Sequence, residues 1–154
     1  MIAIINFGMG NLKSIKNKLM HHKIESIITN KAEDIESAEK LILPGVGNFK
    51  KGMKNLAEFK LIDILNNSVI VQKKPIFGIC LGMQLFANFS EEGNSKGLGW
   101  IEGEVKKFNF KDDKKLKIPH IGWNKINMVK GNNLLEGISN NQSFYFTHSY
   151  HLEC

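Results

Sequence analysis

The residue best placed for covalent chemistry is a cysteine between two glycines. Cys80 stands in Gly78-Ile79-Cys80-Leu81-Gly82, after an apolar run and before an amphipathic segment. A G-x-C-x-G pattern between a strand and a helix is the thiol form of a nucleophile elbow, a turn that holds the nucleophile in strained backbone geometry. A helix N-terminus there would lower the pKa of the thiol. We predict that Cys80 is a nucleophile rather than a small buried core residue.

A thiolate that attacks a carbonyl group needs N–H donors where the negative oxygen develops. The backbone N–H of Leu81, directly after the cysteine, is the first candidate. A second could come from Pro44-Gly45-Val46-Gly47, which follows another apolar run and whose glycines would let a peptide N–H face the site. The residues alone leave this segment equally open to interpretation as an ordinary turn.

The elements that would position these residues follow from short apolar runs and helical spacing. Strands are predicted over 2–5, 24–28, 40–43 and 75–79, and helical segments over 12–20, 53–71 and 80–89. This alternation, with short turns, predicts right-handed crossovers and a mostly parallel α/β sheet with helices on both faces. Glycines 93, 97, 99 and 103 are expected in loops, and further strands over 105–110, 124–129 and 143–148.

Length and composition fit one globular domain. The 154 residues are 42% hydrophobic and 23% charged, which excludes disorder, coiled coil and collagen. Two cysteines are too few for a disulfide framework, nothing at Met1 resembles a secretory signal, and no apolar run is long enough to span a bilayer. We expect a single domain over residues 1–154, a cytoplasmic location and no membrane contact.

The formal net charge of +6 does not indicate a nucleic-acid partner. All 21 basic residues are lysine, and arginine, the usual reader of guanine, is absent. The many lysines, asparagines and isoleucines favour a general compositional bias. The lysines at 106, 107, 111, 114, 115 and 117 are expected to form a solvated hairpin.

Six motifs together resemble a known family. The chain is similar to the class I (triad) glutamine amidotransferases and, among them, to the glutaminase subunits of imidazole glycerol phosphate synthase. The motifs are Phe7-Gly8-Met9-Gly10-Asn11-Leu12, Pro44-Gly45-Val46-Gly47, Gly78-Ile79-Cys80-Leu81-Gly82-Met83-Gln84, Ser90-Glu91-Glu92-Gly93, Pro119-His120-Ile121-Gly122-Trp123-Asn124 and Tyr145-Phe146-Thr147-His148-Ser149-Tyr150.

The resemblance implies a flavodoxin-like fold and a defined chemistry. Members hydrolyse L-glutamine through a cysteine thioester and pass ammonia to a separate (β/α)8 cyclase subunit, as a heterodimer without cofactor or metal. The residues this assigns are Cys80 as nucleophile, Val46 and Leu81 as the oxyanion hole, Gly47, Gln84, Ser149 and Tyr150 as glutamine contacts, and Asn11 and Trp123 as the partner interface.

The general base of such an enzyme is a histidine oriented by a carboxylate. His21 and His22 are expected to close a helix, His120 to be a structural or interface residue, and His148 to match a position at the glutamine pocket. In the family, the base and its carboxylate stand in a Phe-His-Pro-Glu motif, downstream of the last motif above. We therefore interpret His151-Leu152-Glu153 as a coincidence.

The end of the chain supports the same expectation. Residues 144–148 have the pattern of an interior strand, yet the sequence stops at Cys154. We expect a C-terminally incomplete domain that lacks the histidine–glutamate pair and is inactive in this form.

Two other functions stay open. Asn6-Phe7 replaces the family's usual Asp-Tyr, and Gly97-Leu98-Gly99-Trp100-Ile101, with Asp112-Asp113 before Pro119, is similar to a paralogous branch. That branch supplies ammonia to enzymes that make amidino sugars for surface glycans. The missing base also allows an inactive glutamine-binding or regulatory subunit.

Overall fold

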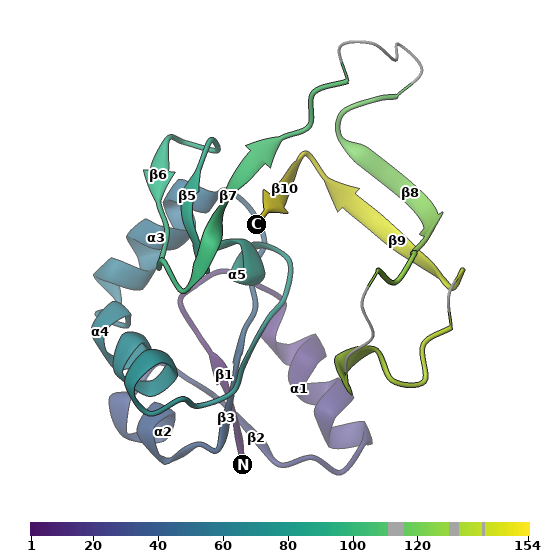
Figure 1. The fold of residues 1–154 in the computed structure, drawn as a ribbon. Coiled ribbons are helices and arrows are strands. Elements are labelled where there is room, and N and C mark those ends of the chain that lie inside the picture. The colour runs from purple at the N-terminus through teal and green to yellow at the C-terminus, as the bar shows by residue number, and fades with distance from the viewer. Residues whose placement is uncertain (111–115, 130–132, 140) are drawn as a thin grey trace. The chain divides into compact units, whose positions relative to one another are not determined.

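The computed structural model describes residues 1–110, 116–129, 133–139 and 141–154 (Figure 1). They form two compact units. The larger unit is Met1–Lys106 with Leu152–Cys154, and the smaller unit is Lys107–His151. Three lysines of the expected basic hairpin (111, 114 and 115), together with Asp112 and Asp113, lie outside the described residues.

A four-stranded parallel sheet forms the core of the larger unit. Its order is β2-β1-β3-β4, and every neighbouring pair is parallel. The strands are β1 (Ile2–Ile5), β2 (Ser26–Thr29), β3 (Lys40–Leu43) and β4 (Ile76–Gly78). The central strands bury most of their β-branched and leucine side chains, and Ile4, Ile5 and Leu43 are completely buried. The parallel α/β sheet predicted from the sequence is confirmed.

Two strands differ from the prediction. β2 begins at Ser26 rather than at Ile24, because the Ile24 N–H instead bonds the Leu19 carbonyl at 2.9 Å, closing the preceding helix. β4 was expected to be buried on both faces, but the Phe77 side chain is 46% exposed. Within the described ranges, β4 lies at the sheet edge and has β3 as its one neighbour.

Helices flank this sheet. In Figure 1, α1 lies on one side of it, and α2, α3 and α4 lie on the other. Their bounds are α1 (Leu12–His21), α2 (Ala32–Ser37), α3 (Phe49–Glu58), α4 (Ile62–Asn66), the π-helical turn η1 (Asn67–Val71) and α5 (Leu81–Gln84). The apolar stripe of α1 is not fully buried, and Met20 is 64% exposed.

The long helical stripe predicted over 53–71 is broken after α3. Lys60 has a left-handed φ of 56°. Its N–H bonds the Ala57 carbonyl and the Leu61 N–H bonds the Leu56 carbonyl, both at 2.9 Å. This pair of bonds is a Schellman cap, and the buried side chains Leu56 and Leu61 are its apolar contact. The chain therefore turns at Lys60 and starts a new helix.

The helix predicted from Cys80 through Phe89 was wrong in length. α5 ends at Gln84, and Ala87–Ser90 forms strand β5. The carbonyls of Leu85 and Phe86 accept the N–H groups of Leu98 and Trp100, each at 2.8 Å. Because a later segment bonds these carbonyls, they cannot continue the helix.

A second sheet has the order β10-β7-β5-β6. Its further strands are β6 (Ser95–Lys96), β7 (Ile101–Lys107) and β10 (Tyr150–Glu153). Gly103, expected in a loop, lies within β7, where an added Cβ would overlap the Glu153 carbonyl oxygen. The strand expected over 105–110 thus begins earlier and ends at Lys107.

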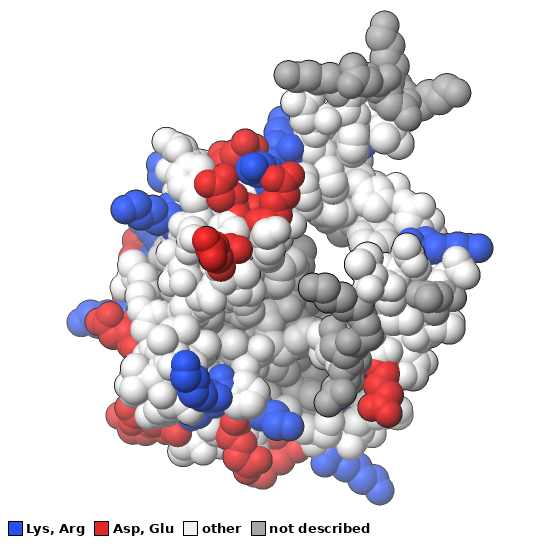
Figure 2. All heavy atoms as spheres, in the orientation of Figure 1, with Lys and Arg blue, Asp and Glu red and all other residues white. Residues whose placement is uncertain are grey.

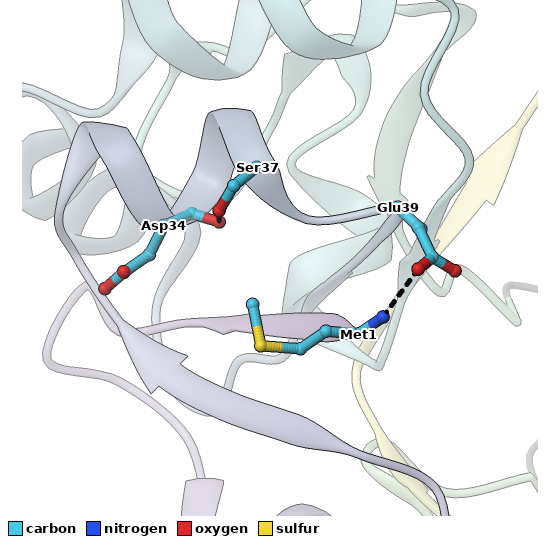
Figure 3. A network of polar contacts seen from close by, with 4 residues as sticks. All are labelled: Met1, Asp34, Ser37 and Glu39. Carbon is cyan, nitrogen blue, oxygen red and sulfur yellow. Dashed lines mark hydrogen bonds and ion pairs between the residues drawn. The ribbon is translucent and has the colours of Figure 1, made fainter.

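The start of the chain is fixed beside β3. The Met1 ammonium group donates to Glu39 Oε1 at 2.9 Å (Figure 3). That hydrogen bond, together with the ammonium charge, holds the pKa of Glu39 below its ordinary value of 4.5. Nearby, the Ser37 hydroxyl donates to the Asp34 carbonyl at 3.2 Å, and the Thr29 hydroxyl donates to the Asp34 carboxylate at 2.6 Å.

The smaller unit is built on an antiparallel hairpin. β8 (His120–Lys125) pairs with β9 (Ser143–His148), from His120 opposite His148 to Lys125 opposite Ser143. A short 3-10 turn, η2 (Asn133–Leu135), lies between them in the chain. The bounds predicted for β9 are confirmed, whereas the strand expected over 124–129 lies over 120–125. β9 is also not interior: in the described structure it pairs with β8 alone, and its side chains alternate between half-buried and exposed.

Charge and hydropathy add two observations. Among the described residues, no helix is both long and apolar enough to cross a membrane. On the face seen in Figure 2, lysine side chains and carboxylates are interspersed over the larger unit. The net positive charge is therefore not gathered into one patch on this face.

Candidate active site at Cys80

Three loops of the larger unit meet beyond the carboxyl ends of β1, β3 and β4. A Cβ added at Gly10 would lie 3.3 Å from Pro44 Cβ, and one at Gly45 would lie 2.8 Å from the Gly82 nitrogen. Gly47 likewise lies against Met9, with 3.1 Å between an added Cβ and Met9 Cε. Ligands of open parallel sheets bind in this position. The structure thus brings the segment 44–47 against the turn that holds Cys80.

The backbone at Cys80 is strained. Its φ is 53° and its ψ is −116°, values that a residue with a Cβ rarely adopts. The Gly82 N–H bonds the Ile79 carbonyl at 3.0 Å, and the Met83 N–H bonds the Cys80 carbonyl at 3.0 Å. This turn projects the thiol to the surface, and Cys80 is exposed. The turn geometry is the one predicted from the G-x-C-x-G pattern.

The two glycines of the pattern are required by packing. An added Cβ at Gly78 would lie 2.5 Å from Met83 Cα, and one at Gly82 would overlap the carbonyl oxygen of Leu43. Side chains at either position would push α5 away from the ends of β3 and β4. The strained turn is therefore held by close contact between backbones.

Two N–H groups are available as donors near the thiol. Leu81 is the first residue of α5, where the N–H has no intrahelical acceptor. Val46 lies in the adjoining loop with its side chain 58% exposed. In the described part of the chain, neither N–H forms a hydrogen bond. Each N–H is therefore open to a further acceptor.

The helix field at the thiol is weaker than the sequence predicted. α5 has four residues, so it aligns about one turn of peptide dipoles. Of the other expected contacts in this unit, Gln84 ends α5 and is half-buried. Asn11 caps α1, because its side-chain oxygen accepts the Ser14 N–H at 3.3 Å.

The remaining predicted site residues lie in the smaller unit. Trp123 is 72% exposed on β8, with its ring 5.7 Å from that of Tyr145. The Ser149 carbonyl accepts the Phe108 N–H at 3.0 Å, and the Tyr150 carbonyl accepts from His148 Nδ1 at 2.9 Å. Hydrogen bonds within the smaller unit thus fix the backbone at Ser149 and Tyr150.

The histidines of α1 and His151 have the following surroundings. His21 and His22 close α1, as expected, with ring centroids 5.5 Å apart. The His151 ring stacks on Phe108 at 4.6 Å. Glu153 Oε2 lies 2.8 Å from Lys106 Nζ. The Glu153 carboxylate is thus bonded to a lysine, and the interpretation of His151-Leu152-Glu153 as a coincidence stays a prediction.

One constellation was missed from the sequence. His120 Nδ1 lies 2.8 Å from His148 Nε2, and Asn124 bonds the other nitrogen of His120. The signal was present, since a hairpin pairs the first residue of one strand with the last of the other. Among the described residues, no three His, Cys, Asp or Glu side chains are grouped to hold a metal ion.

Comparison with known proteins identifies the family. The family described as "Glutamine amidotransferase class-I" matches residues 3–154. The chain belongs to the class I glutamine amidotransferases. A solved glutamine amidotransferase structure has the same fold, with a TM-score of 0.65 at 20% identity, over 96% of this chain and 70% of that one.

Curated relatives carry a more specific name. "Imidazole glycerol phosphate synthase subunit HisH 2" of Methanococcus maripaludis is 52% identical over 154 residues, which are 100% of this chain and 75% of that protein. "Imidazole glycerol phosphate synthase subunit HisH 1" of Campylobacter jejuni is 48% identical over 155 residues, covering 100% of this chain and 76% of the relative. This amidotransferase therefore spans about three quarters of these relatives.

Proposed function

We propose that this amidotransferase is the glutaminase subunit of an imidazole glycerol phosphate synthase, in histidine biosynthesis in the cytoplasm. It hydrolyses L-glutamine to glutamate and ammonia, and the ammonia passes to a (β/α)8 cyclase subunit in a heterodimer. Residues 1–154 act in this as one amidotransferase domain. The names of the relatives support the pathway, and the strained elbow at Cys80 is the observation that supports the chemistry.

The proposed reaction has two steps. The Cys80 thiolate attacks the side-chain amide carbon of glutamine, the carbon–nitrogen bond breaks, and the nitrogen takes up a proton and leaves as ammonia. Water then attacks the γ-glutamyl thioester, which releases glutamate and restores the thiolate. Exposure of the thiol at the turn supports direct access for glutamine.

The N–H groups of Leu81 and Val46 would stabilise the oxyanion of both tetrahedral intermediates. Contact between Gly45 and the Leu81–Gly82 segment supports this pairing, because it places the two loops side by side. Donors that point to the developing charge are worth about 3 kcal/mol each in comparable enzymes.

Substrate and partner contacts complete the proposal. Gly47, Gln84 and the backbone at Ser149 and Tyr150 would hold glutamine. Asn11 and Trp123 would face the cyclase subunit, and an exposed tryptophan is a residue type enriched in interfaces.

The reaction also needs a histidine, oriented by a carboxylate, for proton transfer. Phe-His-Pro-Glu does not occur in these 154 residues, and Lys106 bonds the Glu153 carboxylate. We propose that thioester formation proceeds slowly on this chain and that turnover needs a histidine–glutamate pair supplied downstream.

Glutamate release tests this proposal. The chain is compared with a form that continues after Cys154 with the residues that follow the equivalent position in the M. maripaludis relative, each with and without cyclase subunit. We expect the continued form to be faster by about three orders of magnitude or more. Cys80→Ser in that form is the matched control and should be inactive. If the 154-residue chain turns over and His151→Ala abolishes it, then His151 and Glu153 are the working pair.

A second partner rests on the sequence. Because Gly97-Leu98-Gly99-Trp100-Ile101 is similar to a paralogous branch, a sugar amidotransferase is the alternative recipient of ammonia. Stimulation of glutamate release by one synthase and not the other distinguishes them.

A further inference from the structure

We propose that His120 and His148 are positioning residues: a hydrogen-bonded pair of neutral imidazoles that fixes the peptide carbonyl of Tyr150. The backbone at Ser149 and Tyr150, which the proposed function assigns to glutamine binding, is thereby held in one orientation. The inference rests on the proposed function for its ligand but not for its geometry.

A continuous line of hydrogen bonds carries this inference. Asn124 Nδ2 bonds His120 Nε2. His120 Nδ1 lies 2.8 Å from His148 Nε2, and His148 Nδ1 lies 2.9 Å from the Tyr150 carbonyl oxygen. All four residues belong to the smaller unit. We call this line the histidine relay.

When both rings are neutral, the acceptor at the end of the relay determines which ring nitrogens carry hydrogen. A carbonyl oxygen only accepts, so His148 Nδ1 must carry the hydrogen. In a neutral ring His148 Nε2 then accepts, and therefore His120 Nδ1 carries the hydrogen between the rings. His120 Nε2 is left as an acceptor, which matches the amide N–H₂ of Asn124. Neutral rings in this arrangement are therefore both Nδ1–H tautomers, assigned by this donor and acceptor logic.

Aromatic packing keeps the two rings in place. Phe108 meets the His148 ring edge-on at 4.9 Å, and Phe146 stacks on His120 at 4.9 Å. These contacts restrict rotation about the ring axes. A cavity of about 590 Å³, lined by both histidines, Asn124 and the two phenylalanines among others, borders the relay.

Two successive peptide groups are fixed in consequence. The Phe108 N–H holds the Ser149 carbonyl at 3.0 Å, and the relay holds the Tyr150 carbonyl at 2.9 Å. Because each peptide group is planar and trans, fixing its carbonyl also fixes the direction of the N–H that follows. A backbone oriented in this way binds a ligand without the cost of ordering a loop.

Nitrogen NMR tests the relay directly. Long-range proton–nitrogen spectra of the histidine rings, recorded where imidazoles are neutral, report which nitrogen carries hydrogen. We expect Nδ1–H tautomers for His120 and His148. An Nε2–H tautomer at either residue would overturn the relay, whatever the function of the protein.

Covalent capture of Cys80 tests the positioning role. The probe is 6-diazo-5-oxo-L-norleucine, a reactive glutamine analogue, whose saturation separates the binding constant from the inactivation rate constant. His148→Asn keeps an N–H near the Nδ1 position, whereas His148→Gln moves it to the Nε2 position. We expect His148→Gln to weaken binding about fivefold, as for one lost hydrogen bond, with the rate constant unchanged. His148→Asn should stay within about twofold of the parent chain.

The outcomes separate the two proposals. Capture at Cys80 with equal binding constants in the parent and both His148 variants would overturn the positioning role and leave the proposed function standing. Failure of the parent chain to bind or react with the analogue would overturn the proposed function and the glutamine role of the relay together. His21→Gln, at the end of α1, should change neither constant.

Discussion

At the residue scale, backbone contacts set the position of the Cys80 thiol. An added Cβ at Gly82 would overlap the Leu43 carbonyl oxygen, and Gly45 lies against the same turn. These contacts place the first turn of α5 on the end of β3 and keep Cys80 at a φ of 53°. The strain at Cys80 is therefore balanced by packing around it.

Substituting Gly82 tests this packing. We expect Gly82→Ala to lower the free energy of unfolding by about 2–3 kcal/mol, because the methyl group forces β3 and α5 apart. Gly99→Ala is the control: unlike Gly82, Gly99 has a positive φ of 68°, and a Cβ added there meets no atom closer than 3.4 Å, so backbone strain acts without overpacking. Gly99→Ala should lower the free energy of unfolding by about 1 kcal/mol, from backbone strain alone. Urea unfolding measures both, and equal losses would contradict the packing argument.

At the element scale, α1 and α3 end in left-handed lysines where glycine is the usual residue. Lys23 and Lys60 have φ values of 57° and 56°, and each stands at the position after the helix cap. Both caps make the two backbone bonds of a Schellman motif. The lysines accept a strained φ because these bonds stabilise both turns, and at Lys60 the buried Leu61 side chain adds to them.

Replacing Lys60 with glycine should stabilise the protein. Removing the Cβ relieves the strain of the left-handed φ, so Lys60→Gly should raise the free energy of unfolding by about 1 kcal/mol. Lys51→Gly within α3 is the control and should lower it by about 0.5–1 kcal/mol. The two changes are chemically identical, so opposite signs in thermal unfolding would come from backbone conformation. A loss of stability in Lys60→Gly would show that the cap is not strained.

The same elements show how far the sequence predicts the structure. The apolar runs predicted β1 and β3 with their bounds, because a buried parallel strand needs only local composition to be recognised. The break at Lys60 carried no such signal, since lysine is common inside helices. The length of α5 depended on bonds from Leu98 and Trp100, which are distant in sequence.

The candidate site was likewise predictable only where its geometry depends on residues close together in the sequence. The glycines around Cys80 are local in sequence, so the elbow geometry could be predicted. The histidine relay needed the register of β8 against β9, which is set by pairing across 28 residues. Roles assigned by resemblance to Val46, Gln84 and Trp123 stay predictions.

At the scale of the whole molecule, an ion pair joins β7 to the final strand. Lys106 Nζ lies 2.8 Å from Glu153 Oε2 and 3.9 Å from Glu104 Oε2. The hydrogen bond to Glu153, followed by the charge of its carboxylate, raises the pKa of Lys106 above its ordinary value of 10.5. The pair fastens β10 close to the end of the sequence.

This raised pKa predicts a pH dependence of stability. Because the folded-state pKa of Lys106 is raised, the stabilisation by its ion pair with Glu153 is complete below pH 10.5. It is lost as pH rises through the folded-state pKa. The melting temperature of Lys106→Met should therefore lie below that of the parent chain at neutral pH and approach it in strong alkali. Lys96→Met, at an exposed position on β6, should show no such convergence. High salt should shrink the difference, because both side chains are partly exposed.

Covalent capture distinguishes Cys80 as the glutamine-directed nucleophile from an ordinary exposed thiol. Cys80 and Cys154 are both exposed, so accessibility alone does not separate them and each serves as control for the other. After reaction with 6-diazo-5-oxo-L-norleucine, intact mass and peptide mapping should show one adduct, at Cys80, and competition by glutamine should slow its formation. Cys80→Ser should remove the adduct. Equal modification of Cys154, or none at Cys80, would contradict the assignment of Cys80 as the glutamine-directed nucleophile.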